Sequence, residues 1–75
     1  MTLFADTLKK YLDTKNTTIY TISKISGVDR TMIQHMKVGK RMPANVADVT
    51  AIAKAMMLNP SETAELLRAY HISHM

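Results

Sequence analysis

The sequence contains no cysteine and no tryptophan, and it has only two glycines and two prolines among its 75 residues. The absence of cysteine excludes a disulfide framework and thiolate zinc sites. No uninterrupted apolar stretch approaches the roughly 18 residues of a membrane span, and Met1–Tyr11 lacks the layout of a signal peptide. A chain this short buries only about 60–65% of the surface that its unfolded form exposes, which leaves little room for an enclosed catalytic cavity. We therefore expect one soluble cytoplasmic domain over residues 1–75, with no membrane partner.

Basic residues concentrate in the middle of the chain. Ten basic and six acidic residues give a net charge of +4. Residues 18–43 carry five basic side chains and one acidic one, whereas the segments before and after have net charges of +1 and −1. A localised basic segment favours an anionic partner such as nucleic acid. A solvated basic surface without such a partner fits the composition about equally well.

The pattern of apolar residues predicts an all-α domain of five short helices. The only β-branched cluster, Thr17–Ile22, has no second strand or hairpin turn with which to pair. Apolar residues instead recur three and four positions apart, and each expected helix begins at a side chain that can cap backbone amides. The expected caps are Thr2, Thr18, Asp29, Asn45 and Asn59, the last followed by Pro60 and Glu62 in a capping-box pattern. The expected inward-facing residues are Phe4, Leu8, Tyr11 and Leu12, then Ile33 and Met36, then Val49, Ile52, Ala53 and Met56, and finally Leu66, Leu67 and Tyr70.

Residues 18–38 give the most specific signal in the chain. Ser23 is small enough for two helix backbones to approach each other, and Gly27 permits a sharp turn because it adopts a left-handed conformation without steric cost. This spacing predicts a helix-turn-helix, whose second helix is held out for the major groove of DNA. The residues expected to build it are Ser23, Gly27, Val28, Ile33 and Gly39.

This segment resembles the phage-repressor helix-turn-helix family (Cro/repressor, or XRE-type). The resemblance rests on ISKISGVDRTMI at residues 22–33 and on GKRMP at residues 39–43, which reproduce the spacing between the two glycines of the family. Residues 52–56 and 59–70 resemble the fourth and fifth helices of the family. The resemblance implies a five-helix transcriptional regulator of bacterial or phage type, or the N-terminal DNA-binding domain of a longer one. It also implies double-stranded DNA as partner, bound by a homodimer or with the help of a companion domain.

The recognition helix, at about residues 30–38, has a distinct outward face. Projection at about 100° per residue puts Ile33 and Met36 on the inner side and polar side chains on the outer side. Arginine can bond guanine, glutamine can bond adenine, and threonine offers a methyl contact to thymine. The resemblance implies base contacts at the matching positions. These positions are Arg30, Thr31, Gln34 and His35.

Phosphate contacts are expected on both sides of these residues. The free amides at the start of the second helix form an anion site, and basic residues at the end of the third helix can neutralise a second stretch of DNA backbone. Such contacts supply affinity without choosing a sequence. The expected residues are Thr18, Tyr20, Thr21, Lys37, Lys40 and Arg41.

The chain departs from the family at two places. Many members have glutamine where Ile19 stands, which removes one expected phosphate contact. Many members also have glutamate where Lys37 stands, paired with an arginine of the first helix at the position that Leu12 occupies. The loss of both partners predicts an apolar contact in place of the ion pair, with Lys37 free to face phosphate.

Other functional classes have weaker signals. His35 has no second metal ligand at a suitable spacing, and His71 and His74 lie near the end of the chain, where helices usually fray. No nucleophile motif and no glycine-rich phosphate loop is present, so we expect neither an enzyme nor a metal or cofactor site. The alternative is a protein-interaction module that uses the same fold. The grouping of Leu67, Tyr70 and Ile72 fits either core closure or a dimer contact.

Overall fold

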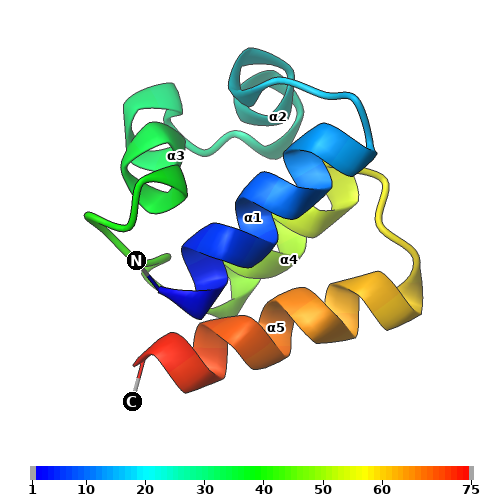
Figure 1. Cartoon of the computed structure of the whole chain (residues 1–75). Coiled ribbons are helices and arrows are strands. Elements are labelled where there is room, and N and C mark those ends of the chain that lie inside the picture. Colours follow the sequence, from blue (N-terminus) through cyan, green and yellow to red (C-terminus); the bar gives the residue numbers. More distant parts are fainter. Residues whose placement is uncertain (1, 75) are drawn as a thin grey trace.

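The computed structural model describes residues 2–74, apart from the side chain of His74. Within this range the regular secondary structure consists of five α-helices, with no strand (Figure 1), which confirms the all-α class. The helices are α1 (Leu3–Thr14), α2 (Ile19–Ser26), α3 (Arg30–Lys37), α4 (Val46–Ala55) and α5 (Pro60–His74). None of the described helices has the length and apolar character needed to cross a membrane.

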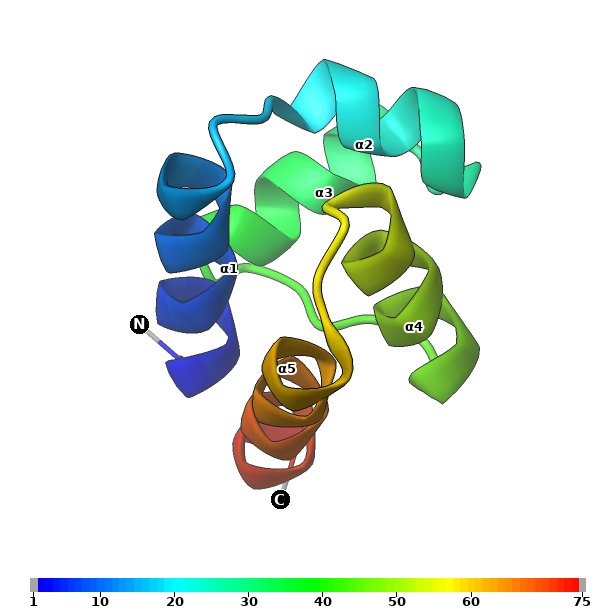
Figure 2. The ribbon, with the colours of Figure 1, turned by 90° about the vertical axis from the view of Figure 1, so that its right-hand side faces the viewer.

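The α2–α3 pair and α5 lie on opposite sides of the molecule. Both views place α1 and α4 between them (Figures 1 and 2). Helix α1 packs against α3 and α5, and α4 packs against α2 and α5. The amide of Phe4 donates to Ser73 Oγ at 3.0 Å, which joins the start of α1 to the end of α5. The outer face of the α2–α3 pair is therefore not covered by the helix that closes the other side of the core.

The helices begin where the sequence predicts. Thr2, Thr18, Asp29 and Asn45 each accept a hydrogen bond from an amide of the first turn that follows. At α5 the amide of Asn59 donates to Glu62 Oε1 at 3.0 Å, and the amide of Glu62 donates to Asn59 Oδ1 at 2.8 Å. This is the predicted capping box. Each cap satisfies amides that have no partner within their own helix.

The core has the predicted apolar rows, except that Leu67 is only partly buried. Phe4, Ile33 and the α4 row around Ile52 are fully buried. Tyr70 closes the core and lies edge-on to Phe4, with ring centroids 6.3 Å apart, whereas Ile72 is 46% exposed. Leu67 lies at the edge of the cluster. Tyr70 thus belongs to the core, and Ile72 remains available to a partner.

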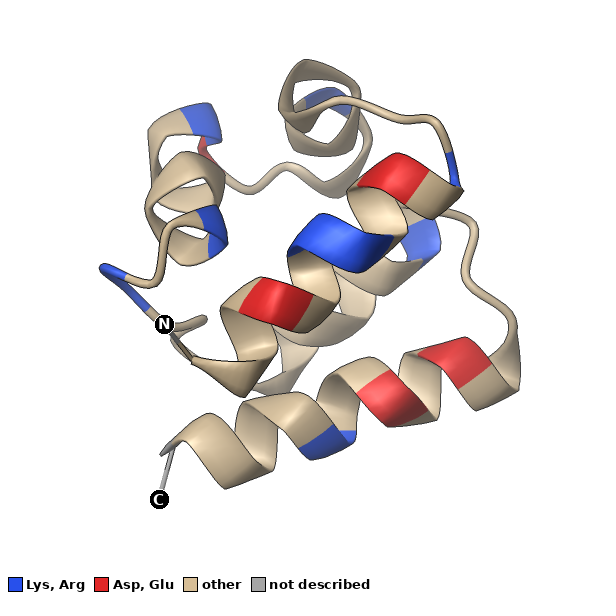
Figure 3. Ribbon diagram, in the orientation of Figure 1, with Lys and Arg blue, Asp and Glu red and all other residues tan. Residues whose placement is uncertain are grey.

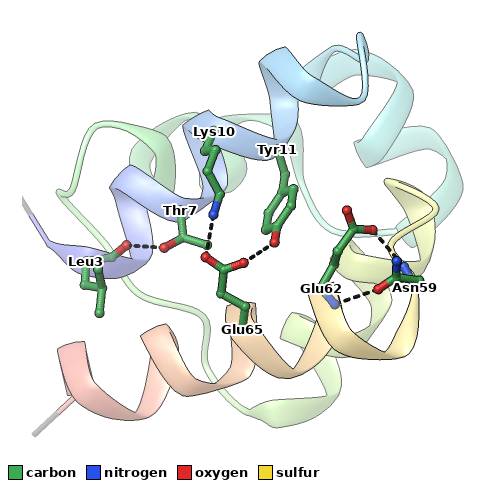
Figure 4. Close-up of polar contacts among 7 residues, drawn as sticks. All are labelled: Leu3, Thr7, Lys10, Tyr11, Asn59, Glu62 and Glu65. Carbon is green, nitrogen blue, oxygen red and sulfur yellow. Dashed lines mark hydrogen bonds and ion pairs between the residues drawn. The ribbon is translucent and has the colours of Figure 1, made fainter.

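A polar seam holds α5 on α1 (Figure 4). Glu65 reaches from α5 to the ammonium of Lys10 and the hydroxyl of Tyr11, and Glu62 pairs with Lys15 at 2.9 Å. Burial raises the pKa of Tyr11 to about 12, and the hydrogen bond and charge of Glu65 add to the effect. The hydrogen bond from Lys10 lowers the pKa of Glu65, and the hydrogen bond from the amide of Asn59 lowers that of Glu62. Both carboxylates therefore stay ionised at neutral pH and can keep their contacts with Lys10 and Lys15.

Helices α1, α3 and α4 end in the same hydrogen-bonding pattern. The residue two positions beyond each helix is left-handed: Asn16 (φ 51°), Gly39 (φ 83°) and Met57 (φ 59°). After α4 the amide of Met57 donates to the Lys54 carbonyl and that of Leu58 to the Ala53 carbonyl, both at 3.0 Å. This is the Schellman motif, which favours glycine at the left-handed position. Glycine and asparagine suit two of the three sites, and methionine at the third carries a conformational cost.

Replacing Met57 by glycine should stabilise the domain. The left-handed conformation costs a residue with a Cβ about 1–2 kcal/mol, and the Met57 side chain is 84% exposed, so its removal loses little packing. We expect the free energy of unfolding to rise by about 1 kcal/mol, measured by urea denaturation. Met57→Ala is the matched control, since it removes the same side chain and keeps the strain. A glycine variant no more stable than the alanine variant would contradict the prediction.

Candidate nucleic-acid interface

The corner between α2 and α3 is held by hydrogen bonds within the turn. Gly27 has φ +79°, and its amide donates to the Ser23 carbonyl at 2.9 Å. Ser23 Oγ donates to the Val28 carbonyl at 2.7 Å, while the Val28 amide donates to Ser26 Oγ at 3.1 Å. A Cβ built on Gly27 would meet no atom within 4 Å, so backbone conformation rather than lack of space favours glycine. Sequence reasoning assigned Ser23 for its size alone, and the structure adds its bond across the turn.

One side of α3 is anchored in the core and the opposite side is exposed. Ile33 and Met36 are buried, and Val28 and Met32 pack against the same cluster. The predicted outward residues Arg30, Thr31 and Gln34 are exposed, whereas His35 is half-buried.

His35 is half-buried and lies beside the loop that follows α3. The His35 carbonyl accepts hydrogen bonds from the amides of Lys40 at 2.8 Å and Arg41 at 3.3 Å. The loop therefore returns to the last turn of α3, and it brings two exposed cations beside the predicted base-reading surface.

The start of α2 offers two unpaired amides. Thr18 Oγ1 accepts from the Thr21 amide at 3.2 Å and lies 3.1 Å from Thr21 Oγ1, so these predicted phosphate contacts already bond to each other. The amides of Ile19 and Tyr20 have no hydrogen-bond partner among residues 2–74. The Ile19 side chain packs against the core and has no polar group with which to bind a phosphate. The candidate anion site at this end therefore consists of amides and hydroxyls.

A hollow of about 560 Å³ joins the start of α2 to the end of α3. Leu12 forms part of its wall and is buried, and the half-buried Lys37 reaches it from α3. Leu12 and Lys37 thus line the same hollow, and the apolar contact expected between them stays a prediction. Lys9 lines the same hollow and was missed as a candidate, although it precedes Leu12 by three residues and therefore shares its helix face.

A second hollow, of about 370 Å³, lies between α2 and the start of α3. Tyr20, Arg30 and Thr31 line it, together with Ser23 and Asp29. Lys24 also lines it and was likewise missed as a candidate; it follows Tyr20 by four residues, on the same face of α2.

The charges on the two sides of the molecule differ. Figure 3 shows mainly basic residues on α2, on α3 and on the loop after it, whereas acidic and basic residues occur together on α1 and α5. The three cations at the end of α3, which are Lys37, Lys40 and Arg41, have no ion pair with a described residue. The α2–α3 side therefore combines exposed hydrogen-bonding side chains with unpaired positive charge.

The described residues contain no group of three histidine, aspartate or glutamate side chains that could hold a metal ion. His71 is exposed on α5, and the side chain of His74 lies outside the described residues.

Comparisons with protein-family models, with curated protein sequences and with solved structures found no match to this chain.

Proposed function

We propose that the chain is a sequence-specific DNA-binding domain that places α3 in the major groove. The observation that carries this proposal is the exposed face of α3, where Arg30, Thr31 and Gln34 stand opposite the buried anchors Ile33 and Met36. Such side chains match the donor and acceptor pattern of base edges. A short helix anchored on one face presents them in a fixed orientation.

Groups suited to phosphate flank this face on both sides. The unpaired amides at the start of α2 lie on one side, and the exposed Lys40 and Arg41 lie on the other. Phosphate contacts of this kind fix the register of a protein on DNA. The proposed set is Thr18, Tyr20, Thr21, Lys37, Lys40 and Arg41, to which the structure adds Lys9 and Lys24 as neighbours.

The proposed biological role is transcriptional regulation in the cytoplasm of a bacterium or in a phage-encoded system. One domain of this size covers a single half-site, so we propose a homodimer or a companion domain that supplies the second half-site. We propose a binding role rather than an enzymatic one.

Selection of duplexes from a random oligonucleotide pool tests the proposal directly. We expect an enriched motif with two half-sites about 10–10.5 base pairs apart, centre to centre. Footprinting on the enriched duplex should protect both half-sites. A pool that shows no enrichment with the full chain at low salt would contradict the proposal.

Two alanine variants separate base reading from phosphate binding. Gln34→Ala should relax the preference at one base position and cost about 1–3 kcal/mol of binding free energy on the best site. Lys40→Ala should weaken binding to every sequence by a similar factor and make the salt dependence shallower. Competition binding with point-mutated duplexes measures both effects. An equal loss on all sequences for both variants would show that Gln34 does not read a base.

A further inference from the structure

Tyr20 and Arg30 meet across the α2–α3 corner. Tyr20 is the second residue of α2, and Arg30 is the first residue of α3. The guanidinium carbon of Arg30 lies 6.0 Å from the centroid of the Tyr20 ring, which is within the range of a cation–π interaction. Both side chains line the hollow of about 370 Å³ between the two helices. The ring thus faces the side chain that we expect to read a base.

The guanidinium of Arg30 has no competing charge partner. It forms no ion pair with any residue in the described part of the chain. The adjacent carboxylate of Asp29 instead caps α3, where its Oδ2 accepts from the amides of Thr31 at 3.0 Å and Met32 at 3.3 Å. The ring of Tyr20 therefore restricts the guanidinium while leaving its N–H donors free.

We propose that Tyr20 is a positioning residue that holds Arg30 in the orientation needed to bond guanine. This inference rests on the proposed DNA-binding function. Arginine bonds the O6 and N7 acceptors of guanine with two parallel donors, so the plane of the guanidinium must be oriented. A ring that faces the guanidinium limits the freedom that the side chain would otherwise lose on binding. The role belongs to the ring of Tyr20, whereas a phosphate contact would belong to its hydroxyl.

The free protein gives the first test. In an NMR spectrum the δ-methylene protons of Arg30 should be shifted upfield by the ring current of Tyr20. The shift should persist in Tyr20→Phe and disappear in Tyr20→Leu. Tyr20 is 59% exposed, so both variants should keep the fold, which thermal unfolding checks. Absence of the shift in the wild-type chain would overturn the proposed contact.

Binding to the selected duplex gives the second test. Tyr20→Leu should lower the preference for guanine at the Arg30 position by about two- to fivefold, as expected for an exposed cation–π contact. Tyr20→Phe should retain the preference. In an Arg30→Gln background, Tyr20→Leu should cause no further loss of discrimination, because the residue that it positions is gone.

The outcomes distinguish this inference from the proposed function. An equal loss of guanine preference in Tyr20→Phe and Tyr20→Leu would assign the effect to the hydroxyl and overturn the positioning role of the ring. Unchanged discrimination in Tyr20→Leu would overturn it as well, with DNA binding itself intact. Failure of the wild-type chain to select any duplex would overturn the proposed function and the reading role together, while the ring-current shift would still report the contact.

Discussion

Raising the salt concentration from 50 to 200 mM should weaken specific DNA binding by about a thousandfold. Lys37, Lys40 and Arg41 supply three unpaired cations per protomer, which makes six in a dimer. Each neutralised phosphate contributes a slope of about −0.9 to the logarithm of the binding constant against the logarithm of salt. A monomer with three contacts should lose only about fortyfold over the same range. Fluorescence anisotropy with a labelled duplex, repeated across the salt series, measures the slope.

Two arginine variants provide the control for this experiment. Arg41→Ala removes a cation from the loop after α3, so the slope should become shallower by about two for a dimer. Arg68→Ala removes a cation from α5, on the side of the molecule opposite α2 and α3, and should leave the slope unchanged. Binding that hardly responds to salt would contradict the phosphate contacts and favour the protein-interaction module.

Local features of the fold could be predicted from the sequence because they depend on neighbours along the chain. A cap such as Asp29 acts on amides two and three residues away, and a glycine such as Gly27 acts through its own φ angle. The turn and the outward face of α3 likewise follow from the spacing of residues that are close in the sequence. The helices therefore begin where the sequence predicts. Arg30, Thr31 and Gln34 are exposed, as predicted, whereas His35 is half-buried.

Features that depend on the packing of distant segments were not predicted. Glu65 meets Lys10 and Tyr11 only because α5 returns along α1, and no spacing in the sequence encodes that contact. Lys9 could have been found from its position one turn before Leu12, but its relation to α2 depends on how the helices cross. The turn between α2 and α3 thus depends on neighbouring residues, whereas the place of Lys9 beside it depends on the packing of distant segments.

Truncation of Ile33 to alanine should lower the free energy of unfolding by about 2–5 kcal/mol. The Ile33 side chain is fully buried and is one of two buried anchors of α3. A domain of this length has a total stability of roughly 4–11 kcal/mol, so the loss is a large share of it. An isolated helix shorter than about 12–15 residues is marginal in water, and α3 has 8 residues. Its order therefore depends on this anchor.

Val38→Ala provides the matched control, because Val38 directly follows α3 and is 42% exposed. It should change the free energy of unfolding by no more than about 0.5 kcal/mol. Ile33→Val should give an intermediate loss of about 0.5–1.5 kcal/mol. Urea denaturation of the three variants measures the series, and binding to the selected duplex should weaken in the same order. Equal losses for Ile33→Ala and Val38→Ala would show that α3 is not held through Ile33, and the fixed outer face on which base reading depends would lose its physical basis.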